Sequence, residues 1–204
     1  MIKLRRTSAM ILVTALLVIL LGQLQAQTTQ QGKPAETVKP VAESSKGKAL
    51  QLTGLTMKVP AGWDEEKIEP TPLGPKAVFK IPKTDPNGED GTVRITHFPD
   101  MKGKDEINID RWLGQVTKPD GQPMTRLDAK ITTLESASLR LTTVDMSGSA
   151  KLTMRDTAKP NQRMIAAIVD HPKGPHFVVS AGPVASMEKW AAQIDAFLKS
   201  AKVE

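Results

Sequence analysis

The chain has 204 residues, with 28 Lys and Arg, 22 Asp and Glu, 3 His, no Cys and no Tyr. The absence of Cys excludes disulfides, thiolate catalysis and Cys-ligated metal sites. The formal net charge of +6 is concentrated in residues 1–48, because basic and acidic residues nearly balance in residues 49–204. A body without a broad positive field does not suit phosphate backbones, so we expect no nucleic-acid partner.

The N-terminus has the layout of a secretory signal peptide. Three basic side chains lie within residues 1–6, an apolar run covers residues 9–22, and a small residue, Ala26, follows. The run is shorter than the roughly 20 apolar residues that a spanning helix needs. We therefore expect cleavage after Ala26, a periplasmic or secreted protein, and no membrane span after cleavage. An uncleaved anchor is the alternative.

The chain divides into three parts. Residues 1–26 form the predicted signal peptide. Residues 27–48 are rich in Gln, Thr, Ser, Lys and Pro and hold few large apolar side chains. Such a segment buries too little surface to offset its chain entropy, so it predicts a disordered linker. Residues 49–204 predict one α+β domain, and their length suffices for a core without disulfides.

In the first half of this domain, alternating apolar residues and turn signals predict strands, followed by one helix. The expected elements are strands at residues 50–59 (with a kink at Gly54), 76–81 and 92–98, and a helix at residues 105–116. Asp105 is the expected N-cap of this helix. The sequence Asp85–Gly88 contains an Asn-Gly step and predicts a tight turn between two strands.

The second half predicts a run of strands and a closing helix. The expected strands cover residues 130–134, 138–146, 151–155, 163–170 and 177–181. Residues 147–149 (Ser-Gly-Ser) are expected to form a turn. The continuously apolar residues 164–169 are typical of a central strand covered on both faces. Apolar residues recur with a helical period from Met187 to Leu198, with Ser186 as the expected N-cap.

This order predicts an α+β fold. Strands joined by short turns favour an antiparallel sheet, and two amphipathic helices can cover one of its faces. We expect a sheet of about six strands with both helices packed on it.

Several segments also resemble a known group of proteins. The sequence MKVPAGW at residues 57–63 is similar to the opening of PsbP-like and Mog-like domains. The sequence NIDRWLGQ at residues 108–115 resembles a helix of exported bacterial proteins of unknown function. Residues 163–169, 174–177 and 181–183 are similar to the closing hairpin of that group. The resemblance covers most of residues 50–200.

The resemblance implies an antiparallel sheet flanked by helices, which is the PsbP-like fold. PsbP-like relatives are non-catalytic accessory or assembly proteins. The bacterial group has no assigned activity, so the resemblance carries no catalytic residue over to this sequence.

Catalytic motifs are missing from the sequence. It contains no G-x-S-x-G, G-x-G-x-x-G or P-loop motif. The acidic pairs lie in expected loops or at a helix start, where they favour solvent or the helix dipole. We therefore assign no catalytic, cofactor-binding or metal-binding residue and expect no cofactor.

Two histidines give an alternative hypothesis. His171 and His176 flank the turn at residues 172–175, and Asp170 is adjacent. Two imidazoles and a carboxylate across a hairpin could hold a divalent ion for metal binding or metal-assisted hydrolysis. Otherwise they are polar residues beside a turn. His97 is expected to be a satisfied histidine within the sheet.

The sequence thus favours an exported, non-enzymatic accessory or binding domain of the cell envelope. Its partner is an unknown protein or envelope component, and its oligomeric state stays open. The three Trp residues are the largest apolar side chains. Trp112 and Trp190 lie on the apolar faces of the expected helices, while Trp63 either contacts a partner or closes the end of the sheet.

Overall fold

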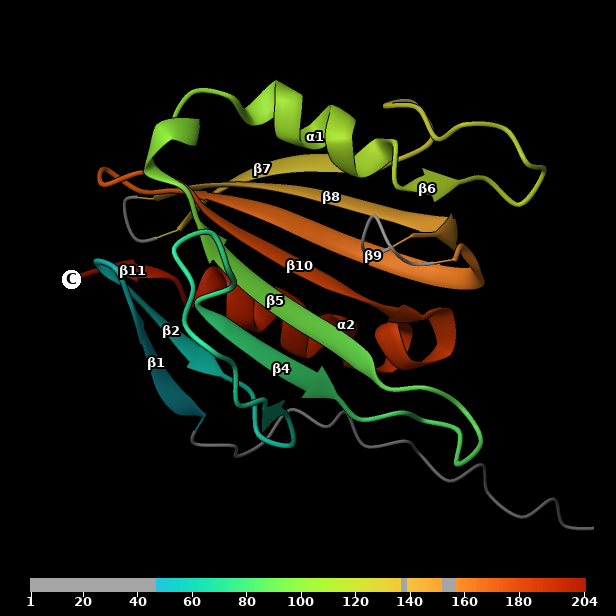
Figure 1. Ribbon diagram of the computed structural model, residues 1–204, viewed down its shortest axis with the longest axis horizontal. Helices are drawn as coiled ribbons and strands as arrows, with labels where there is room; N and C mark the ends of the chain where they lie inside the picture. Colours follow the sequence, from blue (N-terminus) through green and yellow to red (C-terminus); the bar gives the residue numbers. More distant parts are fainter. Residues whose placement is uncertain (1–46, 137–138, 152–156) are drawn as a thin grey trace, which may run out of the picture. The chain divides into compact units, whose positions relative to one another are not determined.

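The computed structural model describes residues 47–136, 139–151 and 157–204 (Figure 1). These residues belong to one compact unit, Glu43–Glu204. The predicted signal peptide (residues 1–26) and most of the predicted linker (residues 27–48) lie outside the described residues. Lys48, expected at the end of the linker, is the first residue of a strand.

The described elements are strands of very different lengths, two α-helices and one short 3-10 helix. In chain order they are β1 (Lys48–Leu52), β2 (Leu55–Val59), β3 (Asp64–Glu65), β4 (Ala77–Ile81), β5 (Gly91–His97), η1 (Pro99–Met101), α1 (Asp105–Leu113), β6 (Val116–Thr117), β7 (Lys130–Ser136), β8 (Leu139–Ala150), β9 (Lys159–Asp170), β10 (His176–Pro183), α2 (Val184–Lys199) and β11 (Lys202–Val203).

The strands form two antiparallel sheets. The larger sheet has eight strands in the order β3-β4-β5-β10-β9-β8-β6, with β7 paired to β8 as well. The smaller sheet has the order β1-β2-β11. The α+β class is confirmed, but the expected number of about six strands is wrong. Strands of two residues, such as β3, β6 and β11, are too short to give a sequence period.

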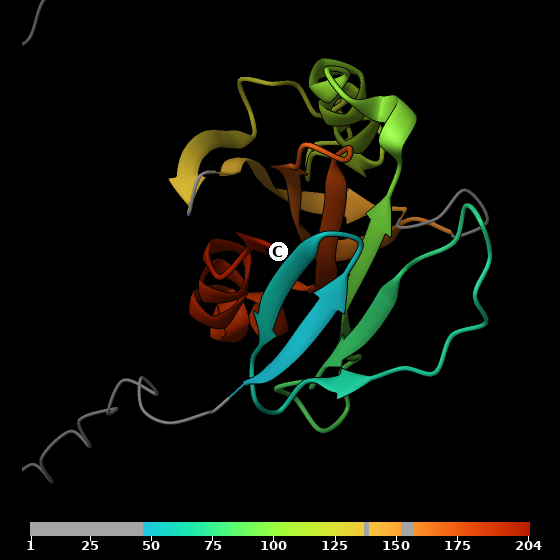
Figure 2. The ribbon, with the colours of Figure 1, turned by 90° about the vertical axis from the view of Figure 1, so that its left-hand side faces the viewer.

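The segment at residues 50–59 is a hairpin and not the single kinked strand expected from the sequence. Leu52 of β1 pairs with Leu55 of β2, and Gly54 between them has a φ of 71°. A positive φ is readily adopted by glycine, so this residue reverses the chain where a kink was expected. Figure 2 shows the hairpin beside the larger sheet.

The two helices cover opposite faces of the larger sheet, which corrects the expectation that both cover one face. Strand β10 shows the division, because its successive side chains point to opposite faces. Val178 packs with Ile194 and Phe197 of α2. Phe177 belongs to the core cluster that contains Trp112 of α1. Figure 1 shows the strands lying between α1 and α2.

Both expected helix N-caps are wrong. Asp105 is the first residue of α1, after Lys104, and α2 begins at Val184, after Pro183. Neither helix has a side-chain cap. Ser186 lies inside the first turn of α2, where its hydroxyl accepts a hydrogen bond from the backbone N–H of Thr84 at 3.3 Å. It therefore ties the loop after β4 to the helix.

Residues 147–149 continue strand β8 and do not form the expected turn. The register between β8 and β9 shifts between Gly148 and Ala150. A Cβ at Gly148 would lie 2.1 Å from the carbonyl oxygen of Thr117. The glycine is required because the backbone of β6 lies directly against it. The strand expected at residues 151–155 falls mainly outside the described residues.

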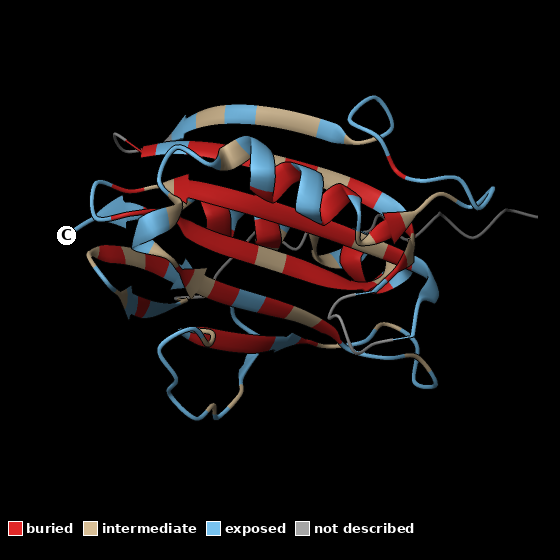
Figure 3. Cartoon of the chain, turned by 45° about the horizontal axis from the view of Figure 1, so that its top comes forward, coloured by how far each residue is buried: buried red, intermediate tan, exposed pale blue. Residues whose placement is uncertain are grey.

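Burial follows the position of each strand in the sheet. Residues 164–169 of β9 are all buried, which confirms the expectation of a central strand covered on both faces (Figure 3). Strand β7, which pairs only with β8, has no fully buried residue from Lys130 to Glu135. The turn predicted at Asp85–Gly88 is also confirmed, since Gly88 N–H donates to the Asp85 carbonyl at 2.9 Å.

Candidate functional site

A groove of about 480 Å³ lies on the face of the sheet that carries α1. Its floor comes from alternate residues of β5 and β10, which pair as Thr92 with Ala181, Arg94 with Val179, and Thr96 with Phe177. Its remaining lining residues are Phe98, after β5, and Arg111, Trp112 and Gln115, from and just after α1. We call this the arginine groove.

Aromatic rings form the apolar part of the arginine groove. The ring of Phe177 lies 6.0 Å from that of Phe98 and 6.1 Å from that of Trp112, the latter edge to face. Phe177 and Trp112 are buried, so they hold this wall in place from beneath. Half of the lining residues are apolar and half are polar, and the volume lies in the range of small-ligand sites.

Two arginines provide the charge of the arginine groove. Neither Arg94 nor Arg111 has an ion pair among the described residues, and none of the described residues that line the groove is acidic. Arg111 donates one hydrogen bond, from Nη2 to Oδ1 of Asn108 at 3.3 Å, and its guanidinium carbon lies 5.8 Å from the Trp112 ring. Partial burial lowers the pKa of Arg111. The groove therefore has two positive charges that no described carboxylate compensates.

The three histidines lie close together on the face of the larger sheet opposite the arginine groove, near the same end of strands β5 and β10. His176 of β10 pairs with His97 of β5, and their rings stack with centroids 4.3 Å apart. His171 meets His176 edge to face at 5.7 Å. All three rings are buried, and His176 has no exposed surface. The sequence predicted that His171 and His176 lie close together, but it did not predict that His97 contacts His176.

The backbone of Lys173 fixes two of these rings. Its N–H donates to Nδ1 of His171 at 3.1 Å, and its carbonyl oxygen lies 3.1 Å from Nε2 of His97. A carbonyl only accepts, so His97 donates from Nε2, and His171 keeps Nδ1 unprotonated. Neither ring nitrogen of His176 has a hydrogen-bond partner.

Burial favours the neutral forms of His171 and His176. Burial, together with the charges that His97 and His171 can carry, lowers the pKa of His176 to about 3. Burial also lowers the pKa of His171, and the positive charge of Lys173 and of other nearby groups lowers it as well. Removing a charged imidazolium from water is unfavourable, so neutral rings are the stable form.

The described residues contain no group of three or more His, Asp or Glu arranged to hold a metal ion. Asp170, the expected third member beside His171 and His176, pairs with Arg140, whose Nη2 lies 3.3 Å from its Oδ2. The structure thus brings the two predicted histidines together and leaves the predicted carboxylate in an ion pair.

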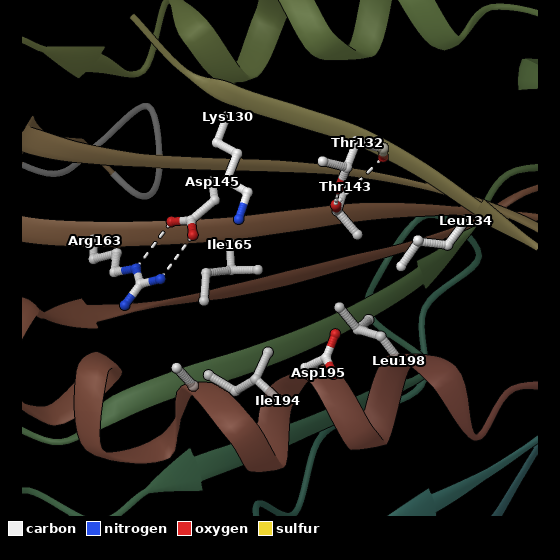
Figure 4. A pocket seen from close by; sticks show the side chains of 11 residues that line it. Lys130, Thr132, Leu134, Thr143, Asp145, Arg163, Ile165, Ile194, Asp195 and Leu198 are labelled. Atoms are coloured by element: carbon white, nitrogen blue, oxygen red, sulfur yellow. Dashed lines mark hydrogen bonds and ion pairs between the residues drawn. The ribbon is translucent and has the colours of Figure 1, made fainter.

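A smaller cavity of about 170 Å³ lies between α2 and strands β7, β8 and β9 (Figure 4). Its main charged groups neutralise each other, because Arg163 donates to both oxygens of Asp145 at 2.9 and 2.7 Å. Thr132 and Thr143 also bond to each other, at 2.6 Å. Because these polar groups bind one another, this cavity has fewer free polar groups for a ligand than the arginine groove has.

The tryptophans expected in the core are there or beside it. Trp112 is fully buried, and Trp190 packs against the core and donates to the carbonyl of Pro82 at 3.1 Å. Trp63 is 8% exposed and lies edge to face with Phe197 at 5.2 Å. Of its two expected roles, Trp63 therefore has the packing one.

Sequence reasoning missed Arg94 and Arg111 as site residues. The alternation in β5 separates Arg94 from Val93 and Ile95, and the helical period separates Arg111 from Trp112. Both signals identify an outward-facing side chain. Neither signal indicates that the two outward faces meet at one groove.

No protein-family model and no curated protein matches the chain. Solved structures that it resembles include a cyanobacterial PsbP from Synechocystis, with a TM-score of 0.45, 14% identity, and coverage of 84% of this chain and 100% of that chain. A protein of unknown function from Pseudomonas aeruginosa has a TM-score of 0.43 and 8% identity, with coverage of 76% and 96%. A Bacteroides thetaiotaomicron protein has a TM-score of 0.43 and 11% identity, with coverage of 78% and 49%.

A PsbP is therefore among the structural neighbours, while membership of the PsbP-like family stays a prediction. At these TM-scores and identities the likenesses carry no inference about binding or activity. Among the described helices, none combines the length and apolarity needed to cross a membrane.

Proposed function

We propose that this chain is an exported, non-enzymatic binding domain of the cell envelope and that the arginine groove is its binding surface. The observation that carries the proposal is the pair Arg94 and Arg111, two cations above an aromatic wall with no described carboxylate beside them. Both side chains are exposed, so an anionic ligand can reach their donors without displacing a described protein partner.

The sequence supports the remaining parts of the proposal. Residues 1–26 have the layout of a signal peptide, which argues for export. The resemblance to PsbP-like domains argues for an accessory role. The sequence contains none of the catalytic motifs considered, which argues for binding over turnover.

The three indole groups allow a direct test. Trp112 lines the groove, whereas Trp63 and Trp190 belong to the core on the α2 side. The exported protein, labelled with ¹⁵N, is titrated with fractions of an envelope extract from the producing cell, and the three indole N–H signals are followed by NMR. We expect the Trp112 signal to shift first, with Trp63 and Trp190 unchanged.

Replacing each tryptophan in turn with phenylalanine assigns the three signals. If every fraction leaves the Trp112 signal in place, or if the shifts gather at Trp190, the groove is not the binding surface. Cell fractionation tests export separately, since a cytoplasmic location of the intact chain contradicts an envelope role.

Metal binding at His171 and His176 is the second candidate. It is favoured by the two ring nitrogens of His176, which have no hydrogen-bond partner among the described residues. It is opposed by the lack of a suitable third ligand among the described residues. Calorimetric titration with Zn²⁺ tests it: heat that is lost in a His171→Ala, His176→Ala double variant supports metal binding, and no heat contradicts it.

A further inference from the structure

The arginine groove combines two kinds of surface within one hollow. One wall is aromatic, formed by Phe98, Phe177 and Trp112. The other groups are two guanidiniums, of Arg94 on the sheet and Arg111 on α1. The two arginines come from different elements and line the same hollow, so a ligand in it faces both charges.

Guanidinium groups have a strong geometric preference for planar anions. Each presents N–H donors in a fixed fork that matches the two oxygens of a carboxylate. Arg94 has no hydrogen-bond or ion-pair partner among the described residues, and Arg111 uses a single donor toward Asn108. Both forks are therefore available to a ligand.

Phe177 and Trp112 are already buried by the protein, so the apolar surface that the groove leaves in contact with water comes from the partly exposed Phe98 and Val179. A free inorganic anion would satisfy the arginines and leave this surface in water, whereas an apolar part of the same ligand would cover it. The hollow of about 480 Å³ is large enough for a ring system or a medium alkyl chain beside the anionic group.

Resting on the proposed binding function, we infer that the arginine groove takes a small amphipathic carboxylate, with its anionic group at Arg94 and Arg111 and its apolar body on Phe98 and Val179. The shared chemistry is a carboxylate joined to an apolar body. Two sources supply it: a flat aromatic acid and a fatty acid.

The experiment compares matched acids and alcohols. The exported protein is titrated with 2-naphthoate and 2-naphthalenemethanol, and with octanoate and 1-octanol, while the Trp112 indole signal is followed by NMR. Ligands of this size bind with a Kd on the order of a millimolar, which NMR measures directly. We expect each acid to bind at least about tenfold more tightly than its alcohol, because a hydrogen-bonded charge pair is worth about that factor. The stronger of the two acids identifies the source.

Variants locate the charge recognition. Arg94→Gln and Arg111→Gln are each expected to weaken acid binding about tenfold and to leave alcohol binding unchanged. Lys189→Gln, on the exposed surface of α2, is the matched control and removes one positive charge without effect on either ligand. Urea unfolding midpoints verify that the arginine variants stay folded, since neither arginine is in a described ion pair.

The outcomes separate the two proposals. Equal binding of acids and alcohols, or acid binding that survives both arginine variants, overturns the carboxylate inference and leaves groove binding intact. If neither acid binds while envelope extract still shifts Trp112, the ligand class is wrong and the proposed function stands. If neither acid nor extract shifts Trp112, both proposals fall.

Discussion

The rings of His97 and His176 stack with centroids 4.3 Å apart across the β5–β10 pair, beneath a sheet whose other face carries the arginine groove. The contact favours a neutral His176, because its protonation would bury a charged imidazolium against the other ring. His171 closes the cluster from the turn after β9. The arrangement makes the stability of the domain sensitive to acid.

Stability is expected to fall as the pH drops below about 6.5. The pKa of His176 is about 3 in the folded protein and near 6.5 when unfolded, so the unfolded chain binds the proton first. The stabilisation by neutral His176 is fully present above the pKa of the unfolded state. It is lost as the pH falls toward the pKa of the folded state, by about 1.4 kcal/mol per pH unit. Urea unfolding between about pH 6.5 and about pH 4.5 should show a loss of about 2 kcal/mol from this group.

A His176→Leu variant separates this effect from the titration of carboxylates. Its loss of unfolding free energy over the same pH range should be smaller than that of the parent by about 2 kcal/mol. An identical pH dependence in the two proteins would show that His176 titrates normally in the fold.

The pair Arg163–Asp145 is expected to be the most valuable ion pair in the α2 cavity shown in Figure 4. It is bidentate, with side chains only 20% and 26% exposed. Asp145→Asn should lower the free energy of unfolding by about 1–3 kcal/mol, because it leaves a partly buried guanidinium without its charge partner.

Glu89→Gln is the control for this prediction. Its carboxylate pairs with Lys159 where both side chains are more than half exposed, so the loss should stay below about 1 kcal/mol. Chemical denaturation measures both variants. Equal effects would mean that the buried pair contributes no more than a surface one.

Gly174 is expected to tolerate no side chain. Its φ is 105°, and an added Cβ would lie 2.4 Å from Cα of Pro99. Gly174→Ala should therefore destabilise by more than about 1 kcal/mol, combining backbone strain with a clash against main chain. Thermal and urea unfolding report the change.

Gly103→Ala provides the comparison, because Gly103 has a similar positive φ of 72° but nothing within 4 Å of an added Cβ. This variant should lose only the cost of strain, about 1 kcal/mol. A Gly174→Ala protein as stable as Gly103→Ala would refute the close approach of the 172–175 turn to Pro99.

The exported form is expected to begin at Gln27. Cleavage after Ala26 follows from the small residue at the end of the apolar run. Intact-mass measurement of the protein recovered from the producing cell checks this directly. Ala26→Leu should block processing and leave the mass of the full chain, whereas residues 1–26 on the parent protein would support the anchor alternative.

Sequence periodicity predicted most long elements closely. The spacing of Ile109, Trp112 and Leu113 located α1, and the apolar run at residues 164–169 located the centre of β9. These predictions succeed because a helix or strand repeats its environment at a fixed interval. The errors fall where that interval is too short or too local to register: the hairpin at Gly54, the strands of two residues, and the helix N-termini.

The sequence by itself determined the α+β class and which side chains share a face within each long element. Only the tertiary structure decided that α1 and α2 lie on opposite faces, that His97 joins His171 and His176, and that Arg94 and Arg111 line one groove. The physical reason is that periodicity describes one element at a time. A site made by several elements depends on how they pair and pack, and those long-range contacts leave no repeating signal in the sequence.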